Sequence, residues 1–193
     1  MRRLNLSLPA GPPDLPRLMM MSDTRRLPDP EEAARRLPKG AALILRHYKA
    51  PGRAALARRL AILCQRRGLR LLIAGDPRLA AGCGAAGLHL AEWDHHQIHG
   101  WRRQHPEWLI TAAAHGTKGL IRAARAGADA ALLSPAFATA SHPDGSALGP
   151  WRFAALSHQS RLPVYALGGL SQGNLRRLKG SAAIGIAGIG LFC

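Results

Sequence analysis

Short runs of consecutive apolar residues alternate along the chain with segments in which apolar residues recur at helical spacing. The run from Ala41 to Arg46 is apolar at almost every position, which is typical of a strand buried on both faces of a parallel sheet. The next segment, 54–67, places Leu56 and Leu60 on one helix face, and Gly68 ends that helix as a C-cap. Together they predict one βα unit.

The same alternation recurs through the rest of the sequence. The predicted strands are 18–22, 41–46, 69–74, 87–90, 109–114, 130–134, 163–167 and 182–189, and the predicted helices are 30–37, 54–67, 77–84, 94–104, 117–126, 151–157 and 171–178. Repeated units of this kind predict an α/β fold, a (β/α)₈ TIM barrel, with a doubly wound open sheet as the alternative.

The length of the chain sharpens the barrel prediction. Its 193 residues fall just below the length of about 200 residues that is usual for such a barrel. We therefore expect a minimal barrel that lacks the last helix, with a partner subunit or the N-terminal segment covering the open side. One domain is expected over 1–193, with residues 1–17 flexible.

Composition and charge narrow the function classes. No run reaches the ~18 apolar residues of a membrane span, and four prolines between Pro9 and Pro16 interrupt any signal-peptide core. The three cysteines have no metal-binding spacing, which favours a cytoplasmic protein with reduced thiols. Lys and Arg number 27 against 11 Asp and Glu, a formal charge of +16, and such a charge favours an anionic partner.

Nucleic acid is the less favoured anionic partner. The basic residues are spread over many predicted helices, and aromatic residues make up only 5% of the chain. A surface that binds single-stranded nucleic acid usually combines a basic groove with aromatic stacking positions. A phosphorylated small molecule is therefore the favoured partner, and nucleic acid remains the alternative.

Two glycine clusters follow the last two predicted strands. Gly168 and Gly169 come directly after one strand, and Gly188 and Gly190 end the other. Active sites of TIM barrels lie at the C-terminal ends of the strands, where the last two loops often bind phosphate through backbone amides. The alternative is that these glycines only permit tight turns.

Acidic residues and histidines supply further candidates. Asp76 and Asp94 each follow a predicted strand, where a carboxylate can bind Mg²⁺ or cap a helix N-terminus. His95 is expected, with two neighbouring histidines, on a solvated helix, whereas His89 is expected as a hydrogen-bonded residue inside the barrel. His115 lies in a loop, where it can touch a ligand.

Six segments in this order resemble the thiamine phosphate synthase and thiazole tautomerase superfamily over residues 18–189. They are Leu43–Arg46, Ala86–Leu90, Thr111–His115, Gly127–Thr139, Tyr165–Leu170 and Gly185–Ala187. The resemblance implies a barrel enzyme of thiamine biosynthesis that joins a hydroxymethylpyrimidine diphosphate to a thiazole phosphate. It also implies release of pyrophosphate and a requirement for Mg²⁺. A homodimer is expected.

The resemblance also implies roles for individual residues. It places the catalytic Arg46 at the diphosphate and Asp94 at Mg²⁺. His142 stands where the synthases have a lysine, and Asp76 lies one residue after the place of their first Mg²⁺ ligand, so His142 is expected to replace the catalytic lysine and Asp76 the metal ligand. The residues that it implies for substrate and phosphate binding are Thr139, Ser141, Gly168, Gly169, Ile186, Gly188 and Gly190.

The chain departs from the synthase pattern at several of these positions. Ile44 and Tyr48 stand where the synthases have Gln and Lys, and Ala74-Gly75 replaces an Asn-Asp pair. Ala113 replaces a serine, and Pro135 occupies the place of the catalytic histidine of the tautomerases. A tautomerase-like or catalytically diverged barrel that binds thiazole phosphate is therefore the alternative function.

Overall fold

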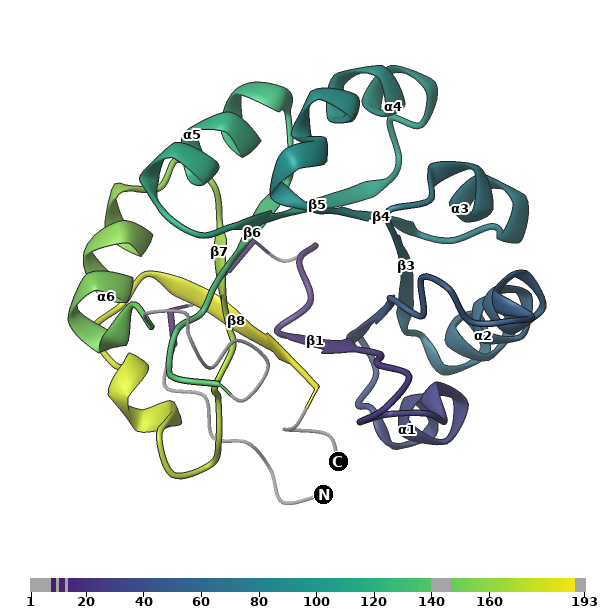
Figure 1. The fold of residues 1–193 in the computed structure, drawn as a ribbon, viewed down its shortest axis with the longest axis horizontal. Coiled ribbons are helices and arrows are strands. Elements are labelled where there is room, and N and C mark those ends of the chain that lie inside the picture. The colour runs from purple at the N-terminus through teal and green to yellow at the C-terminus, as the bar shows by residue number, and fades with distance from the viewer. Residues whose placement is uncertain (1–7, 10, 13, 140–146, 190–193) are drawn as a thin grey trace.

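The chain forms a closed barrel of parallel strands, in which each strand pairs with the next and β8 pairs with β1 (Figure 1). The computed structural model describes residues 8–9, 11–12, 14–139 and 147–189. The strands are β1 Leu18–Met21, β2 Ala42–Leu45, β3 Arg70–Ala74, β4 Gly87–Leu90, β5 Leu109–Ala114, β6 Ala130–Leu133, β7 Val164–Leu167 and β8 Ala183–Gly188. The barrel is confirmed, and the doubly wound open sheet is wrong.

Helices surround the barrel as an outer ring (Figure 1). They are α1 Pro30–Arg36, α2 Arg53–Arg67, α3 Pro77–Cys83, α4 Ile98–Gln104, α5 Thr117–Ala126 and α6 Gly149–Gln159, with two 3₁₀ helices, η1 Glu92–Gln97 and η2 Leu175–Leu178. None of the helices in the described ranges is long and apolar enough to cross a membrane.

Two predicted helices differ from those observed. The segment 94–104 is split into η1 and α4, and only η2 forms within 171–178. The prediction at 171–178 is wrong because Ser171, Gly173 and Asn174 favour turn geometry over a continuous helix. A long turn therefore follows β7.

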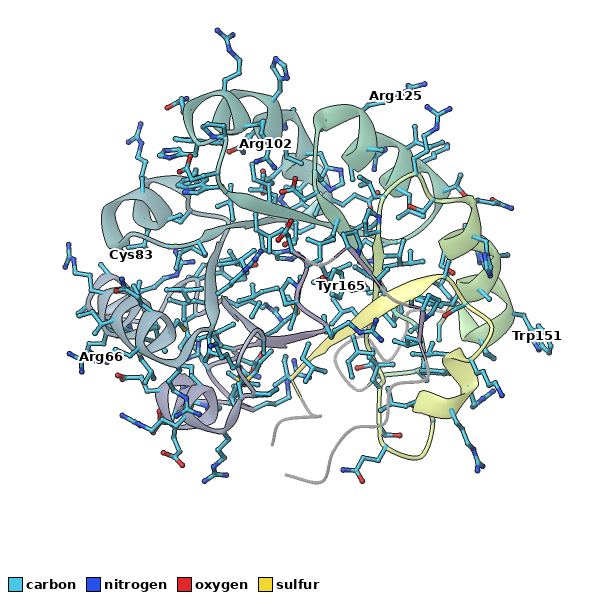
Figure 2. The ribbon with its side chains drawn as sticks, turned by 180° about the vertical axis from the view of Figure 1, so that it is seen from behind. Arg66, Cys83, Arg102, Arg125, Trp151 and Tyr165 are labelled. Atoms are coloured by element: carbon cyan, nitrogen blue, oxygen red, sulfur yellow. The ribbon has the colours of Figure 1, made fainter. Side chains whose placement is uncertain are left out.

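The strand register shows which residues point into the barrel. Val164 and Ala166 of β7 pack with Phe153 of α6, so Tyr165 between them faces inward, and Figure 2 shows it inside the ring of strands. Residues paired across neighbouring strands share a face, and Ala74, His89 and Thr111 are paired in this way on the inner face. Ile44 of β2 pairs with Leu72, which lies two positions before Ala74 and so shares the inner face. Arg46 follows Ile44 by two positions and therefore extends this inner face at the C-terminal end of β2.

The N-terminal segment packs against the last strand. Tyr165 Oη donates a hydrogen bond to the carbonyl of Pro16 at 2.6 Å, and the amide of Ile186 donates to the carbonyl of Arg17 at 3.1 Å. A Cβ placed on Gly11 would lie 2.9 Å from Ile184 Cβ. Within the described residues, which reach 189, no helix follows β8, and this segment contacts β8 at Ile184.

Candidate active site at the mouth of the barrel

The inner face of the barrel becomes polar toward the C-terminal ends of the strands. His89 Nδ1 lies 2.9 Å from Thr111 Oγ1, and the His89 side chain is buried, as the sequence predicts for a barrel histidine. Burial, together with the charge of the nearby Arg46, lowers the pKa of His89 to about 3. A neutral imidazole therefore lies beside the Arg46 cation.

A buried hydrogen-bond network fixes the backbone at Arg46. Its amide donates to Ser22 Oγ at 2.9 Å, and Ser22 Oγ lies 2.8 Å from His47 Nδ1. Burial lowers the pKa of His47, although a hydrogen bond to the carbonyl of Pro28 opposes this. Neutral His47 accepts a hydrogen bond from the Ser22 hydroxyl, so a lone pair of Ser22 Oγ is directed at the Arg46 amide.

Asp76 is held by two other groups at the end of β3. Its Oδ1 accepts the Leu79 amide at 2.9 Å as the N-cap of α3. Its Oδ2 lies 3.2 Å from Nη1 of Arg53, whose Nη2 donates to the carbonyl of Ala74 at 2.6 Å. The helix-cap alternative is therefore observed. Binding of Mg²⁺ by Asp76 would compete with both contacts.

An exposed aromatic ring lies beside these charges. The Tyr48 ring centroid is 5.9 Å from Arg46 Cζ and 5.7 Å from Arg53 Cζ, within cation–π range. A Cβ placed on Gly75 would lie 3.3 Å from Tyr48 Cε1, so the ring packs over that glycine. Tyr48 thus occupies the space above Gly75, between the two guanidinium groups.

Asp94 differs from Asp76 in its surroundings. It lies half-buried on η1, where its Oδ1 accepts from Gln97 Nε2 at 3.1 Å. Within the described residues it forms no ion pair, so its charge is available to a cation. No group of three or more His, Cys, Asp or Glu that could hold a metal occurs in the described ranges.

The glycine turn after β7 is pressed against the loop after β6. Gly168 and Gly169 have φ of +92° and +64°, in the left-handed region that favours glycine. A Cβ on Gly169 would lie 2.4 Å from the carbonyl oxygen of Phe137 and 2.3 Å from that of Ala138. The Phe137 amide donates to the carbonyl of Gly168 at 3.1 Å. Glycine is therefore required at position 169, because of its positive φ and because a Cβ would meet the two carbonyl oxygens.

Two residues of η1, which follows β4, have roles that sequence reasoning missed. Glu92 Oε2 accepts the His115 amide at 2.8 Å, and its other oxygen pairs with Arg122. His95 is buried, and its Nε2 donates to the carbonyl of Ala113 at 2.9 Å. The prediction of a solvated helix is therefore wrong for His95. The buried Ile98 three positions later was the available signal, because it places His95 on the same face.

His115 keeps a fixed orientation at the rim of the barrel. Its Nδ1 lies 3.0 Å from the carbonyl oxygen of Ser134 and 3.2 Å from Ser134 Oγ, so both contacts join the ring to the end of β6. The prediction that His115 can touch a ligand stays a prediction.

The remaining predicted residues fall into two groups. Thr139 is half-buried in the loop after β6, and Gly188 is the buried last residue of β8. Ile186 lies inside β8 with its amide bonded to Arg17, so the described structure offers no support for a phosphate contact there. Ser141, His142 and Gly190 lie outside the described residues.

The excess of positive charge lies largely on the helices. Arg66 of α2 and Arg125 of α5 project outward from the ring, as Figure 2 shows, and both are exposed. Arg46, in contrast, extends the inner face of the barrel. The outward placement of these arginines agrees with a solvated surface.

The inward arginine and the glycine turn lie at one end of a closed parallel barrel. The closed parallel barrel with its outer ring of helices defines the class of (β/α)₈ barrel proteins, whose active sites lie at this end of the strands. The sequence model described as Thiamine monophosphate synthase matches residues 19–192, and the chain belongs to this family of transferases.

Individual relatives agree with this assignment. A protein of Aquifex aeolicus provisionally named thiamine-phosphate synthase 2 is 30% identical over 184 residues, which cover 93% of this chain and 98% of that protein. The thiamine-phosphate synthase of Albidiferax ferrireducens is 31% identical over 154 residues, or 77% of this chain and 69% of that protein. The thiamine phosphate pyrophosphorylase of Pyrococcus furiosus shares the fold, with a TM-score of 0.79 and 23% identity over 92% of this chain and 86% of that one.

Proposed function

We propose that this protein joins a hydroxymethylpyrimidine diphosphate to a thiazole phosphate and releases pyrophosphate, in the cytoplasm. The observation that carries the proposal is the joint placement of Arg46 and the Gly168–Gly169 turn at one mouth of the barrel. A guanidinium matches a diphosphate, and backbone amides suit a phosphate monoester. Two phosphorylated substrates thus have a separate anion-binding feature each.

The bond changes assign a task to Arg46. The bond between the pyrimidine methylene carbon and the diphosphate oxygen breaks, and the diphosphate leaves with the electron pair. The thiazole nitrogen lone pair then forms the new bond to that carbon. Negative charge develops on the leaving oxygen, and the Arg46 guanidinium, beside neutral His89, stabilises it.

Mg²⁺ fits this site through one carboxylate. Asp94 keeps a charge that no cation among the described residues neutralises, whereas Asp76 is bound to Arg53 and to the N-terminus of α3. Mg²⁺ in proteins is often held by one or two carboxylates together with substrate phosphates. When bound, it would neutralise the leaving diphosphate. Asp94 would hold it.

The activity is tested with purified protein, both phosphorylated substrates and Mg²⁺. Formation of thiamine phosphate, separated by chromatography, is expected for the wild-type chain and for the control variant Arg66→Met, whose side chain projects from the outer surface. Arg46→Met is expected to lose it. No thiamine phosphate above background from the wild-type chain would refute the proposal.

A second candidate is a tautomerase-like or diverged barrel that binds only the thiazole phosphate. It is favoured by the Arg53–Asp76 ion pair, which occupies one predicted metal ligand while the glycine turn is intact. Calorimetry separates the two candidates. Binding of thiazole phosphate without binding of the pyrimidine diphosphate supports the second, and binding of both supports the first.

A further inference from the structure

The glycine turn after β7 is closed by the side chain of Asn174. Asn174 Nδ2 donates to the carbonyl of Gly169 at 2.7 Å, and Asn174 Oδ1 accepts the amide of Ser171 at 2.9 Å. The same amide group therefore bonds the backbone on both sides of Leu170. Asn174 is half-buried.

No long helix stabilises this segment. After β7 the first regular element is η2, a single 3₁₀ turn that begins at Leu175. The backbone contributes the amides of Asn174 and Leu175, which both donate to the carbonyl of Ser171 at 3.1 Å. The position of Gly169 relative to Ser171 therefore depends on the Asn174 side chain.

The contact with Gly169 fixes the direction of a neighbouring amide. Among the described residues the only cis peptide bond joins Ser134 and Pro135, so the bond from Gly169 to Leu170 is trans. In a planar trans peptide the C=O and N–H groups point in opposite directions. With the Gly169 carbonyl directed at Asn174, the Leu170 N–H points away from Asn174.

Three consecutive amides of this turn have no acceptor. Within the described part of the chain, the amides of Gly168, Gly169 and Leu170 donate no hydrogen bond, whereas the Ser171 amide is taken by Asn174. Consecutive free amides in a turn with left-handed residues form a concave anion-binding site. The turn thus has donors prepared for a phosphate group.

We propose that Asn174 is a positioning residue for the phosphate-binding turn. Asn174 donates a hydrogen bond to the carbonyl of Gly169 and accepts one from the Ser171 amide. These two bonds direct the Leu170 amide at the phosphate oxygens of a phosphate monoester. The inference rests on the proposed function for the identity of that monoester, the thiazole phosphate. Asn174 itself does not touch the ligand.

Calorimetry with matched ligands tests this role. Asn174→Ala is expected to weaken binding of the thiazole phosphate about 10- to 100-fold, as for the loss of a hydrogen bond to a charged group. Its affinity for the dephosphorylated thiazole alcohol should not change. Asn174→Asp keeps the acceptor for Ser171 and loses the donor to Gly169, so it should lose at least as much affinity for the ester.

Ser160→Ala is the matched control. Ser160 Oγ donates to the carbonyl of Leu162 and accepts the Leu162 amide, at 2.9 and 3.1 Å, in the loop before β7. Like Asn174, Ser160 bonds two backbone groups of a loop through its side chain, but that loop lies at the other end of β7. It should lower the melting temperature by a similar amount and leave ester binding unchanged. Equal losses for ester and alcohol in Asn174→Ala would overturn the proposal, as would no loss at all.

A second measurement separates this inference from the proposed function. The ¹H–¹⁵N resonances of Gly168, Gly169 and Leu170 are followed while inorganic phosphate is added. Shifts are expected in the wild-type chain and not in Asn174→Ala, even if thiazole phosphate is not the substrate. Absence of shifts in the wild-type chain, or equal shifts in the variant, would contradict the positioning role.

Discussion

The two sides of the barrel mouth are built from different parts of the chain. At the ends of β2 and β3 the groups are side chains, with Arg46, Tyr48, Arg53 and Asp76 in contact or near contact. At the ends of β6 and β7 the groups belong to the backbone, where the Gly169 turn packs on the carbonyl of Phe137. One side is held by charge, the other by chain geometry.

The difference bears on the positions at which the sequence differs from the synthases that it resembles. Ile44 of β2 is one of them, and a side chain can be exchanged there without changing the strand that carries it. A turn that needs a positive φ and no Cβ accepts only glycine, and Gly169 is kept. The side-chain half of the mouth can therefore change its chemistry, whereas the backbone half is restricted to glycine at position 169.

The largest expected effect is on the side-chain half. Arg46→Met removes the guanidinium at the leaving diphosphate, and kcat should fall by about 10²- to 10³-fold, as when one transition-state donor is lost. Binding of thiazole phosphate should change little, because that ligand is assigned to the other half. Steady-state kinetics and calorimetry measure the two effects, and a comparable loss in both would remove the distinction between the halves.

The backbone half is tested with Gly169→Ala. The new Cβ would lie 2.3 Å from the carbonyl oxygen of Ala138 at a φ of +64°, and overpacking with backbone strain should destabilise the fold by about 3 kcal/mol. Gly40→Ala is the control, because Gly40 has a φ of +83° and no atom within 4 Å of the added Cβ. It should cost about 1 kcal/mol. Denaturant unfolding compares them, and equal losses would mean that the contact with Ala138 is unimportant.

The buried His89 on the inner face of the barrel makes the stability of the fold depend on pH. Burial lowers the pKa of folded His89 to about 3, while the unfolded chain binds that proton below about pH 6.5. Between these values the unfolded state holds more protons, so stability falls as the pH falls, with a slope of about 1.4 kcal/mol per pH unit from this group.

His89→Gln should reduce that slope, whereas Thr111→Val should lower stability at every pH and keep the slope. Urea unfolding at pH 7, 6, 5 and 4 measures it. An unchanged slope in His89→Gln would show that His89 is not held neutral in the folded barrel.

The smallest expected effect is on the Mg²⁺ requirement, and it should differ between Asp94 and Asp76. Asp94→Asn should raise the Mg²⁺ concentration needed for half-maximal activity about tenfold, equivalent to about 1.4 kcal/mol. Asp76→Ala should leave the metal requirement unchanged and cost about 1 kcal/mol of stability through the lost helix cap. Titration of Mg²⁺ and thermal unfolding check both variants, and a raised Mg²⁺ requirement in Asp76→Ala would restore Asp76 as a ligand.

The sequence predicts the strands better than the connections. Most strand residues are buried and apolar, so the pattern of a strand is local, and all eight strands are found near the predicted positions. The sequence predicts a helix over 171–178, but only η2 forms there. Asn174 bonds backbone groups outside the apolar pattern, so apolar spacing alone could not indicate the turn.

The site is less predictable because its contacts join distant parts of the chain. The two consecutive glycines indicate the turn at Gly168 and Gly169, because a glycine adopts a positive φ without steric cost. The helix cap by Asp76 is local, since Asp76 precedes Pro77 and accepts the Leu79 amide. The ion pair with Arg53, which lies 23 positions earlier, is not local, and no pattern around Asp76 indicates it.

The seam between β1 and β8 has a consequence for synthesis on the ribosome. The contacts that anchor the N-terminal segment are among the longest in the chain, and Tyr165 and Pro16 are 149 positions apart. Until Ile186 has emerged, β1 has one unpaired edge, and such an edge can pair with other chains. Closure at Arg17 is therefore a late event in biogenesis, and the exposed edge of β1 is open to pairing with other chains during that interval.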